Sequence, residues 1–283
     1  MDKFFKIVGR TTRRFFTDGV GRTSAQLAYY LFFSLFPIII LVNAVISRFG
    51  VDIKYVVQRF DYLFPRQMTE IVTDYLDYLT GIESTTFAIG AIFTALYALT
   101  RAFNSLLNSV RTAYRIKRAG AVNYMTAFIL SAFIMIAFFL LTILILGGEV
   151  VVTELEKYIY IPDSIISLLQ LIKFVLLPAV IFLTLCGFYY IVPSRRFRFR
   201  RAVPGSVFSL LGLTVVTMAF SYYISHFSNY SLLYGSLAAV MILMVWLKLV
   251  ATILIMGGEL NYVIIEMTED RLGYTRDKKS ESK

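Results

Sequence analysis

The stretch YGSLAAVMILMVWLKLVATILIMGGELNY, residues 234–262, has the length and apolarity of a helix that crosses a membrane. It carries a lysine, Lys248, near its middle, where the hydrocarbon core of a bilayer would lie. It ends in Gly-Gly-Glu-Leu-Asn, which places Glu259 and Asn261 at or just inside the bilayer edge. A charge at mid-membrane depth costs roughly 3 kcal/mol on insertion scales, so such residues usually face a cavity or a partner. We therefore expect a buried polar site beside this helix.

The rest of the chain has the same apolar character. Hydrophobic residues make up 58% of its 283 positions and only 16% are charged, against roughly 25% in soluble domains. Five further stretches approach or exceed the length needed to span a bilayer, at residues 25–47, 87–107, 125–147, 168–192 and 204–225. The sequence thus predicts an all-α membrane protein with six transmembrane helices. These form one domain over residues 1–268, followed by a charged, disordered tail at 269–283.

The distribution of basic residues predicts the orientation. Most of the 28 Lys and Arg residues precede the first stretch, follow the second, fourth or sixth stretch, and so fall on one side. By the positive-inside rule that side is cytoplasmic, together with both termini. The net charge of +10 then indicates attraction to anionic lipid headgroups, the expected partners. The Arg-rich segment 194–201 lies between two spanning stretches, so no nucleic-acid partner is predicted.

Two larger patterns stand out between the stretches. Residues 49–86 include RQMTEIVTDYLDYL, with apolar positions at helical spacing, which predicts an outer amphipathic helix between the first two spans. The sequence ILILGGEV at 143–150 is echoed by ILIMGGEL at 253–260. One interpretation is a three-plus-three inverted repeat, as in many transporters. The other is chance similarity within low-complexity apolar sequence.

Polar residues at helical spacing suggest a cavity. The first stretch places Gln26, Tyr30 and Pro37 near one face, with Ser34 elsewhere around the helix. Pro37 should kink the helix, either around cavity water or in simple packing. The second stretch carries a stripe that includes Arg101, Asn104 and Asn108. This stripe is either a cationic cavity wall or an arginine that reaches the interface beside helix-pairing amides. Arg101 and Glu259 are one hypothetical ion pair.

Enzymatic motifs are absent from the sequence. It contains no HExxH, CxxC, GxSxG or phosphate-binding glycine loop. Its single histidine, His226, and single cysteine, Cys186, cannot build a metal site alone. No catalytic residue, metal or cofactor is therefore expected, and the chain is not predicted to be an enzyme.

Four segments together resemble the YihY/BrkB family of bacterial inner-membrane proteins. They are the first stretch with AYYLFFSLFP, the second with RAFNSLLNSVRTAY, the junction FYYIVPSRRFRFRRAVPGS, and the last stretch with its GGELN ending. The resemblance implies six spanning helices in the plasma membrane and a link to virulence and envelope physiology. Some members were once labelled ribonuclease BN. Family members usually have an aromatic or apolar residue around Lys248, so Glu259 and Asn261 become the stronger site candidates.

The function that we expect is transport. The predicted substrate of the cationic cavity is an anionic lipid, another amphiphile or an ion, with Glu259 as a proton or cation ligand in a coupled mechanism. The alternative is an envelope scaffold without transport, and a ribonuclease is disfavoured. Small residues at 235, 238 and 239 can pack within one bundle or between subunits of a homo-oligomer.

Overall fold

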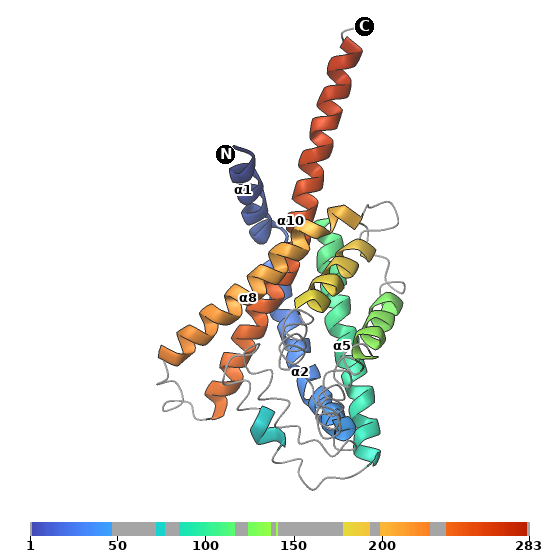
Figure 1. Cartoon of the computed structure of the whole chain (residues 1–283), viewed down its shortest axis with the longest axis vertical. Helices are drawn as coiled ribbons and strands as arrows, with labels where there is room; N and C mark the ends of the chain where they lie inside the picture. Colours follow the sequence, from blue (N-terminus) through green and yellow to red (C-terminus); the bar gives the residue numbers. More distant parts are fainter. Residues whose placement is uncertain are drawn as a thin grey trace, which may run out of the picture.

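The computed structural model describes residues 2–46, 72–76, 85–116, 124–136, 140, 178–192, 199–226 and 236–281. Within these ranges every regular element is a helix and no strand occurs (Figure 1). The predicted all-helical class is therefore confirmed. Among the described residues, three segments are long and apolar enough to cross a membrane, namely Val20–Ile40, Phe199–Tyr223 and Leu237–Thr268.

Four long helices coincide with predicted spans. They are α2 (Val20–Ile46), α5 (Thr85–Ala113), α8 (Val203–His226) and α10 (Ser236–Glu281), which cover the first, second, fifth and sixth stretches. Shorter apolar helices, Tyr124–Ile136 and Pro178–Ile191, fall within the third and fourth. The other parts of those two stretches lie outside the described residues, as do residues 143–150 of the suggested repeat. Of the proposed outer helix, only residues 72–76 are described, and they are helical.

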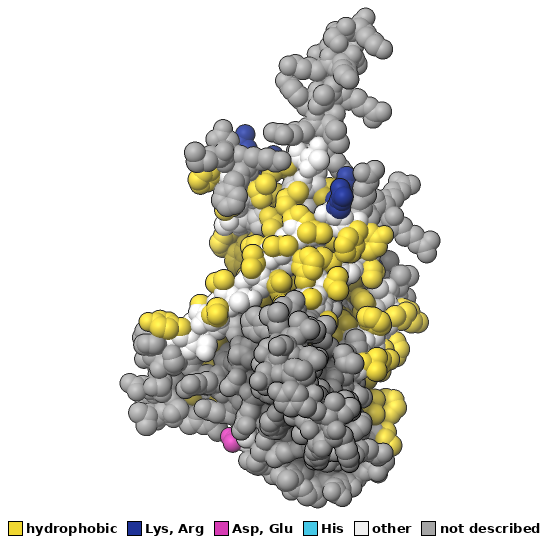
Figure 2. All heavy atoms as spheres, viewed as in Figure 1, with side chains coloured by type: hydrophobic (Ala, Val, Ile, Leu, Met, Phe, Trp, Pro, Cys, Tyr) yellow, Lys and Arg dark blue, Asp and Glu magenta, His cyan; other side chains and the backbone are white. Residues whose placement is uncertain are grey.

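Helix α10 is the centre of the bundle. It contacts α1, α2, α5 and α8, while α2 and α5 also lie side by side (Figure 1). Fully buried aliphatic side chains meet there, including Leu27, Leu107 and Ile255. Large apolar side chains also cover much of the outer surface (Figure 2), among them Phe93 and Met218, each 69% exposed. An apolar exterior around a packed interior suits a protein whose solvent is lipid.

The N-terminal segment forms a helix of its own, α1 (Asp2–Thr17). Asp18 and Gly19 then turn the chain into α2, and Gly19 has a positive φ of 67°, which glycine adopts without strain. Helix α1 buries Thr11 and Arg14 against the bundle and leaves Phe5 and Phe16 exposed. The sequence predicted this segment only as basic and cytoplasmic. It therefore missed a helix whose inner face contributes to the core.

Helix α10 is much longer than the predicted span. Its 46 residues correspond to about 69 Å at 1.5 Å per residue. It continues to Glu281, through residues for which the sequence predicted a disordered tail, and projects from the bundle (Figure 1). No proline interrupts this continuation, and Glu, Arg and Lys favour helix. The chain's two ends lie at the same end of the molecule (Figure 1).

Candidate functional site

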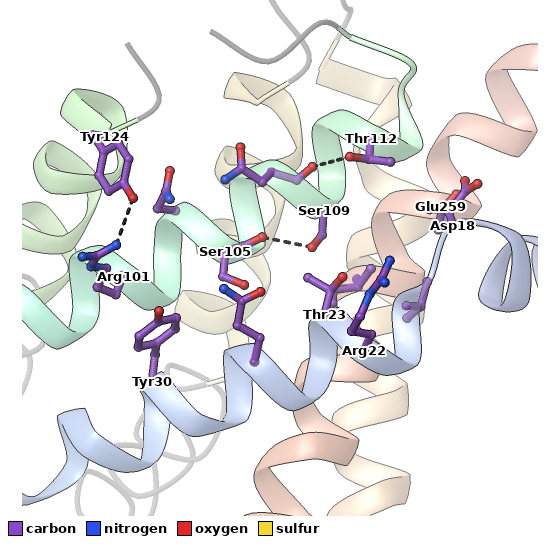
Figure 3. A pocket seen from close by; sticks show the side chains of 15 residues that line it. Asp18, Arg22, Thr23, Tyr30, Arg101, Ser105, Ser109, Thr112, Tyr124 and Glu259 are labelled. Atoms are coloured by element: carbon purple, nitrogen blue, oxygen red, sulfur yellow. Dashed lines mark hydrogen bonds between the residues drawn. The ribbon is translucent and has the colours of Figure 1, made fainter. Parts of the chain in front are cut away.

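A polar cavity of about 300 Å³ lies between α2 and α5, next to α10. Helix α2 contributes Arg22, Gln26 and Tyr30, which are four residues apart and so share one face. Helix α5 contributes a facing stripe in which Arg101, Ser105 and Ser109 recur every four residues (Figure 3). The full lining is Asp18, Val20, Arg22, Thr23, Gln26, Tyr30, Arg101, Asn104, Ser105, Asn108, Ser109, Thr112, Tyr124, Ile255 and Glu259.

The cavity is polar although its helices are mostly apolar. Every lining residue except Val20 and Ile255 carries a polar side chain. Three side-chain atoms of the lining are buried without a hydrogen-bond partner in the described part of the chain, Asp18 Oδ2, Asn104 Oδ1 and Ser105 Oγ. Buried polar atoms are nearly always paired with protein, water or a ligand. The cavity is therefore suited to a polar occupant.

Arg101 lies at one end of the cavity. Its Nε donates to the Tyr97 hydroxyl at 3.2 Å and its Nη1 donates to the Tyr124 hydroxyl at 3.0 Å (Figure 3). Its guanidinium also lies 5.3 Å and 5.7 Å from the centres of these two rings. No carboxylate of the described residues lies within ion-pair distance of it. Tyrosine hydroxyls orient this cation without neutralising it.

The opposite end of the cavity is acidic, and Figure 3 shows Asp18 and Glu259 close together there. Glu259 is only 1% exposed, and its Oε2 lies 3.2 Å from Arg14 Nη1. Asp18 lies 3.9 Å from Arg14 and 3.5 Å from Arg115. Arg14 and Arg115 do not line the cavity, so they neutralise its two acids from outside the lining.

Nearly the whole guanidinium of Arg14 is in contact with other groups of this cluster. Besides Glu259, it donates to the Ala113 carbonyl at 3.0 Å and lies 3.4 Å from Glu266 Oε2. The Tyr262 ring covers it at 4.4 Å. A buried charge is tolerated when carboxylates and hydrogen bonds compensate its desolvation. Arg14 thereby joins α1, the end of α5 and α10.

The Gly257–Asn261 motif has a structural explanation. A Cβ on Gly257 would collide with Ser209 Oγ and the Tyr189 hydroxyl, and one on Gly205 would collide with the Gly257 carbonyl. Helices α8 and α10 can approach this closely only with glycine at the crossing. The Tyr189 hydroxyl shares a 2.8 Å hydrogen bond with Ser209 Oγ.

Asn261 caps the start of α8. Its Oδ1 accepts a hydrogen bond from the Gly205 N–H at 2.6 Å, and its Nδ2 donates to the Ala202 carbonyl at 3.1 Å. The first N–H groups of a helix lack partners within that helix, and this side chain supplies one. Asn261 also hydrogen-bonds with Tyr114, and burial raises the pKa of that phenol above its ordinary value. Asn261 is thus a packing residue rather than part of the cavity lining.

The structure sorts the ten predicted site residues into two groups. Those that line the cavity are Gln26, Tyr30, Arg101, Asn104, Asn108 and Glu259. Those that do not are Ser34, Pro37, Lys248 and Asn261. Ser34 is buried and donates to the Leu31 carbonyl at 2.7 Å, and Pro37 is buried inside α2. Lys248 is exposed on the outer face of α10.

Two hypotheses about charge are corrected by these positions. Glu259 pairs with Arg14, not with Arg101. Lys248 is exposed on α10 and does not line the cavity, and the apolar sequence around it does not reveal which face of α10 is inward. Sequence reasoning also missed Arg14 and Asp18. The only available signal was the amphipathic pattern of residues 2–17, which predicts a helix with a specific inner face.

Comparison with known proteins gives a consistent family. The family model described as "Virulence factor BrkB" matches residues 11–282. A ribonuclease-like protein named YfkH from Bacillus subtilis is 26% identical over 246 residues, covering 85% of this chain and 88% of the relative. A UPF0761 membrane protein from Pseudoalteromonas translucida is 28% identical, with 87% and 82% covered. One from Aggregatibacter aphrophilus is 24% identical, with 92% of both covered. No solved structure matches.

Proposed function

We propose that this chain, which belongs to the BrkB virulence-factor family of membrane proteins, is a transporter that takes an anionic group into the cavity between α2 and α5. The observation that carries the proposal is the balance of charge around that cavity. Its two acids, Asp18 and Glu259, are neutralised by Arg14 and Arg115 from outside the lining. Its two cations, Arg22 and Arg101, have no carboxylate partner among the described residues. The cavity is therefore net cationic and favours an anion.

The size of the cavity restricts the substrate. A volume of about 300 Å³ is at the lower end for small-molecule sites. It accommodates an inorganic ion with water or the headgroup of an amphiphile, but not a headgroup together with its acyl chains. An anionic lipid would therefore insert only its headgroup and keep its chains in the bilayer. This arrangement requires a lateral opening between helices.

The proposed topology has six spanning helices and cytoplasmic termini in the bacterial plasma membrane. Support comes from the basic segments on alternate sides of the predicted stretches. The placement of both chain ends at the same end of the molecule is consistent with an even number of crossings (Figure 1). The proposed lipid partners meet the same basic segments. An inverted repeat and a homo-oligomer remain compatible with this topology.

The alternatives have less physical support. A non-transporting scaffold requires a tightly packed bundle with satisfied polar groups, whereas Asn104 Oδ1 and Ser105 Oγ of this cavity are buried without a hydrogen-bond partner in the described part of the chain. Cation coupling through Glu259 is also less favoured than the sequence suggested, because Arg14 already occupies that carboxylate. A nuclease needs a catalytic set, and the described residues contain no cluster of His, Cys, Asp or Glu arranged for a metal. The ribonuclease-like name belongs to a relative at 26% identity.

The proposal is tested with purified protein in liposomes. Scrambling of a fluorescent anionic lipid and flux of small anions are measured side by side. We expect one of these activities in wild type, a reduction of at least tenfold in Arg101→Gln, and no change in Lys248→Gln. Lys248→Gln is a matched control because it removes an equal charge from an exposed position on a spanning helix. Failure of both activities in folded wild-type protein would refute a transporter.

A further inference from the structure

The Arg101 guanidinium has N–H donors beyond those that the protein uses. A guanidinium group carries five N–H donors. One donor on Nε and one on Nη1 are used by Tyr97 and Tyr124. The other three have no partner in the described part of the chain. Two hydroxyls orient this cation, and its other donors are open to an external acceptor.

Further polar groups share the face of α5 that carries Arg101. Asn104 and Ser105 follow it by three and four residues, and both line the cavity. Asn104 Oδ1 and Ser105 Oγ are buried without a hydrogen-bond partner in the described residues, and Ser105 is only 4% exposed. A serine hydroxyl donates one hydrogen bond, and rotation of the asparagine amide exchanges its oxygen for an N–H donor. Tyr30 on α2 lies across the cavity from Arg101 (Figure 3).

The two ends of the cavity differ in their suitability for an anion. Arg22 and Tyr30 are eight residues apart on α2, which corresponds to about 12 Å along the helix. Figure 3 shows Arg101 and Tyr124 at one end of the cavity, and Asp18 and Glu259 at the other. Asp18 and Glu259 line that end of the cavity, so it is less favourable for an anion than the Arg101 end. The Arg101 end has no carboxylate among the described residues.

We propose that Arg101, with Asn104, Ser105 and Tyr30, forms a subsite for the phosphate group of the substrate. This inference rests on the proposed function because it concerns the same cavity, and it adds the chemical class of the bound anion. The planar guanidinium fork binds two oxygens of a phosphate or a carboxylate in parallel. A carboxylate has no third oxygen for Ser105, Asn104 and Tyr30, whereas a phosphate monoester does. The group can come from free phosphate or from a lipid headgroup.

Binding is measured separately from transport. Full-length protein in lipid nanodiscs of zwitterionic phosphatidylcholine is titrated calorimetrically with inorganic phosphate and with acetate. In a second arm, phosphatidate replaces part of the nanodisc lipid, and its copurification with the protein is quantified. Saturable phosphate binding identifies a soluble phosphate as the source, and selective retention of phosphatidate identifies the headgroup. Either result supports the subsite, and the absence of both overturns it.

Substitutions at Arg101 and Ser105 test the geometry of the subsite. We expect Arg101→Gln to weaken phosphate or phosphatidate binding at least tenfold and Ser105→Ala to weaken it about threefold. Arg101→Lys keeps the charge but loses the fork, so we expect it to resemble Arg101→Gln more than wild type. Lys248→Gln should bind normally. Acetate binding equal to phosphate binding, or full binding by Arg101→Lys, would overturn the assignment. Phosphate binding without any liposome activity would leave the subsite in place and refute the transporter.

Discussion

Arg14 and Arg101 are two arginines near opposite ends of one cavity, and their surroundings differ completely. Arg14 is 8% exposed and contacts Glu259, Glu266, a backbone carbonyl and an aromatic ring. Arg101 contacts two tyrosines and faces the cavity. The first arginine is a structural cross-link whose charge is compensated. The second is held in place with its charge still available.

The difference shows how a charge within a membrane bundle can be assigned a role. The presence of an arginine in the bundle does not by itself indicate a function. The partners of its donors decide between structure and binding. By this criterion we assign the Arg14 cluster a structural role and propose anion binding at the Arg101 end of the cavity. The predictions below test this division.

The largest expected effect is that of Arg14→Gln. Removing one partner of a buried ion pair leaves Glu259 without compensation, and such changes cost roughly 3–5 kcal/mol. We expect a loss of that size in the free energy of unfolding, measured by denaturant titration of purified protein in micelles. Arg13→Gln is the matched control because Arg13 is the adjacent residue and is exposed. Equal stability of the two variants would contradict a structural role for Arg14.

A double variant measures the interaction between Arg14 and Glu259 separately from the effect of each single substitution. Glu259→Gln alone should also destabilise the protein, because Arg14 then loses a carboxylate 3.2 Å away. The combination with Arg14→Gln should cost less than the sum of the two single changes, since the lost interaction is shared. Strict additivity would show that the two side chains do not interact.

Gly257→Ala should have the next largest effect. The new methyl group would collide with Ser209 and Tyr189 at the crossing of α8 and α10, and overpacking of this kind costs roughly 1–3 kcal/mol. Gly90→Ala is the control because a Cβ there meets nothing within 4 Å. It should be neutral or slightly stabilising, as alanine favours helix over glycine. Destabilisation by Gly90→Ala of the same size would refute the packing explanation.

The predictable part of this protein follows from patterns that are local in sequence. Long apolar stretches locate α2, α5, α8 and α10, because a helix needs about 20 predominantly apolar residues to cross a bilayer. The polar stripe at Arg101, Asn104 and Asn108 predicted a cavity wall, because residues three and four apart share a helix face. The Gly257–Asn261 motif, by contrast, was predicted to end the last span, whereas α10 continues through it to Glu281.

The unpredictable part depends on contacts between distant segments. Arg14 and Glu259 are 245 residues apart, so no spacing rule relates them. Lys248 was predicted as a site residue because a charge within a span is costly. The apolar sequence around it does not indicate which face of α10 is inward. Asn261 was predicted as a site residue, whereas it caps α8 through Gly205, a contact that only the packing of α8 on α10 creates.

Tyr189→Phe tests a smaller contribution to the same cluster of helices. It removes the hydroxyl that bonds Ser209 Oγ and the Leu254 carbonyl. Hydrogen bonds between membrane helices contribute about 0.6 kcal/mol on average and up to about 1.7 kcal/mol. We expect a loss within that range in the same unfolding measurement. Tyr29→Phe, at a residue that is 50% exposed, should have no effect. An equal loss in both variants would contradict a specific role for the Tyr189 hydroxyl.

Arg101→Gln should change the free energy of unfolding least, although it should impair transport most. Its partners are the hydroxyls of two exposed tyrosines, Tyr97 and Tyr124, so water can replace the lost donors and no carboxylate is left uncompensated. Lys248→Gln is the control for loss of a positive charge, because Lys248 has no partner in the described part of the chain. We expect both variants to unfold at the wild-type denaturant concentration, measured beside Arg14→Gln. If Arg101→Gln instead unfolds as readily as Arg14→Gln, then Arg101 is a structural cross-link too, and the distinction between a compensated and an available arginine is wrong for this protein.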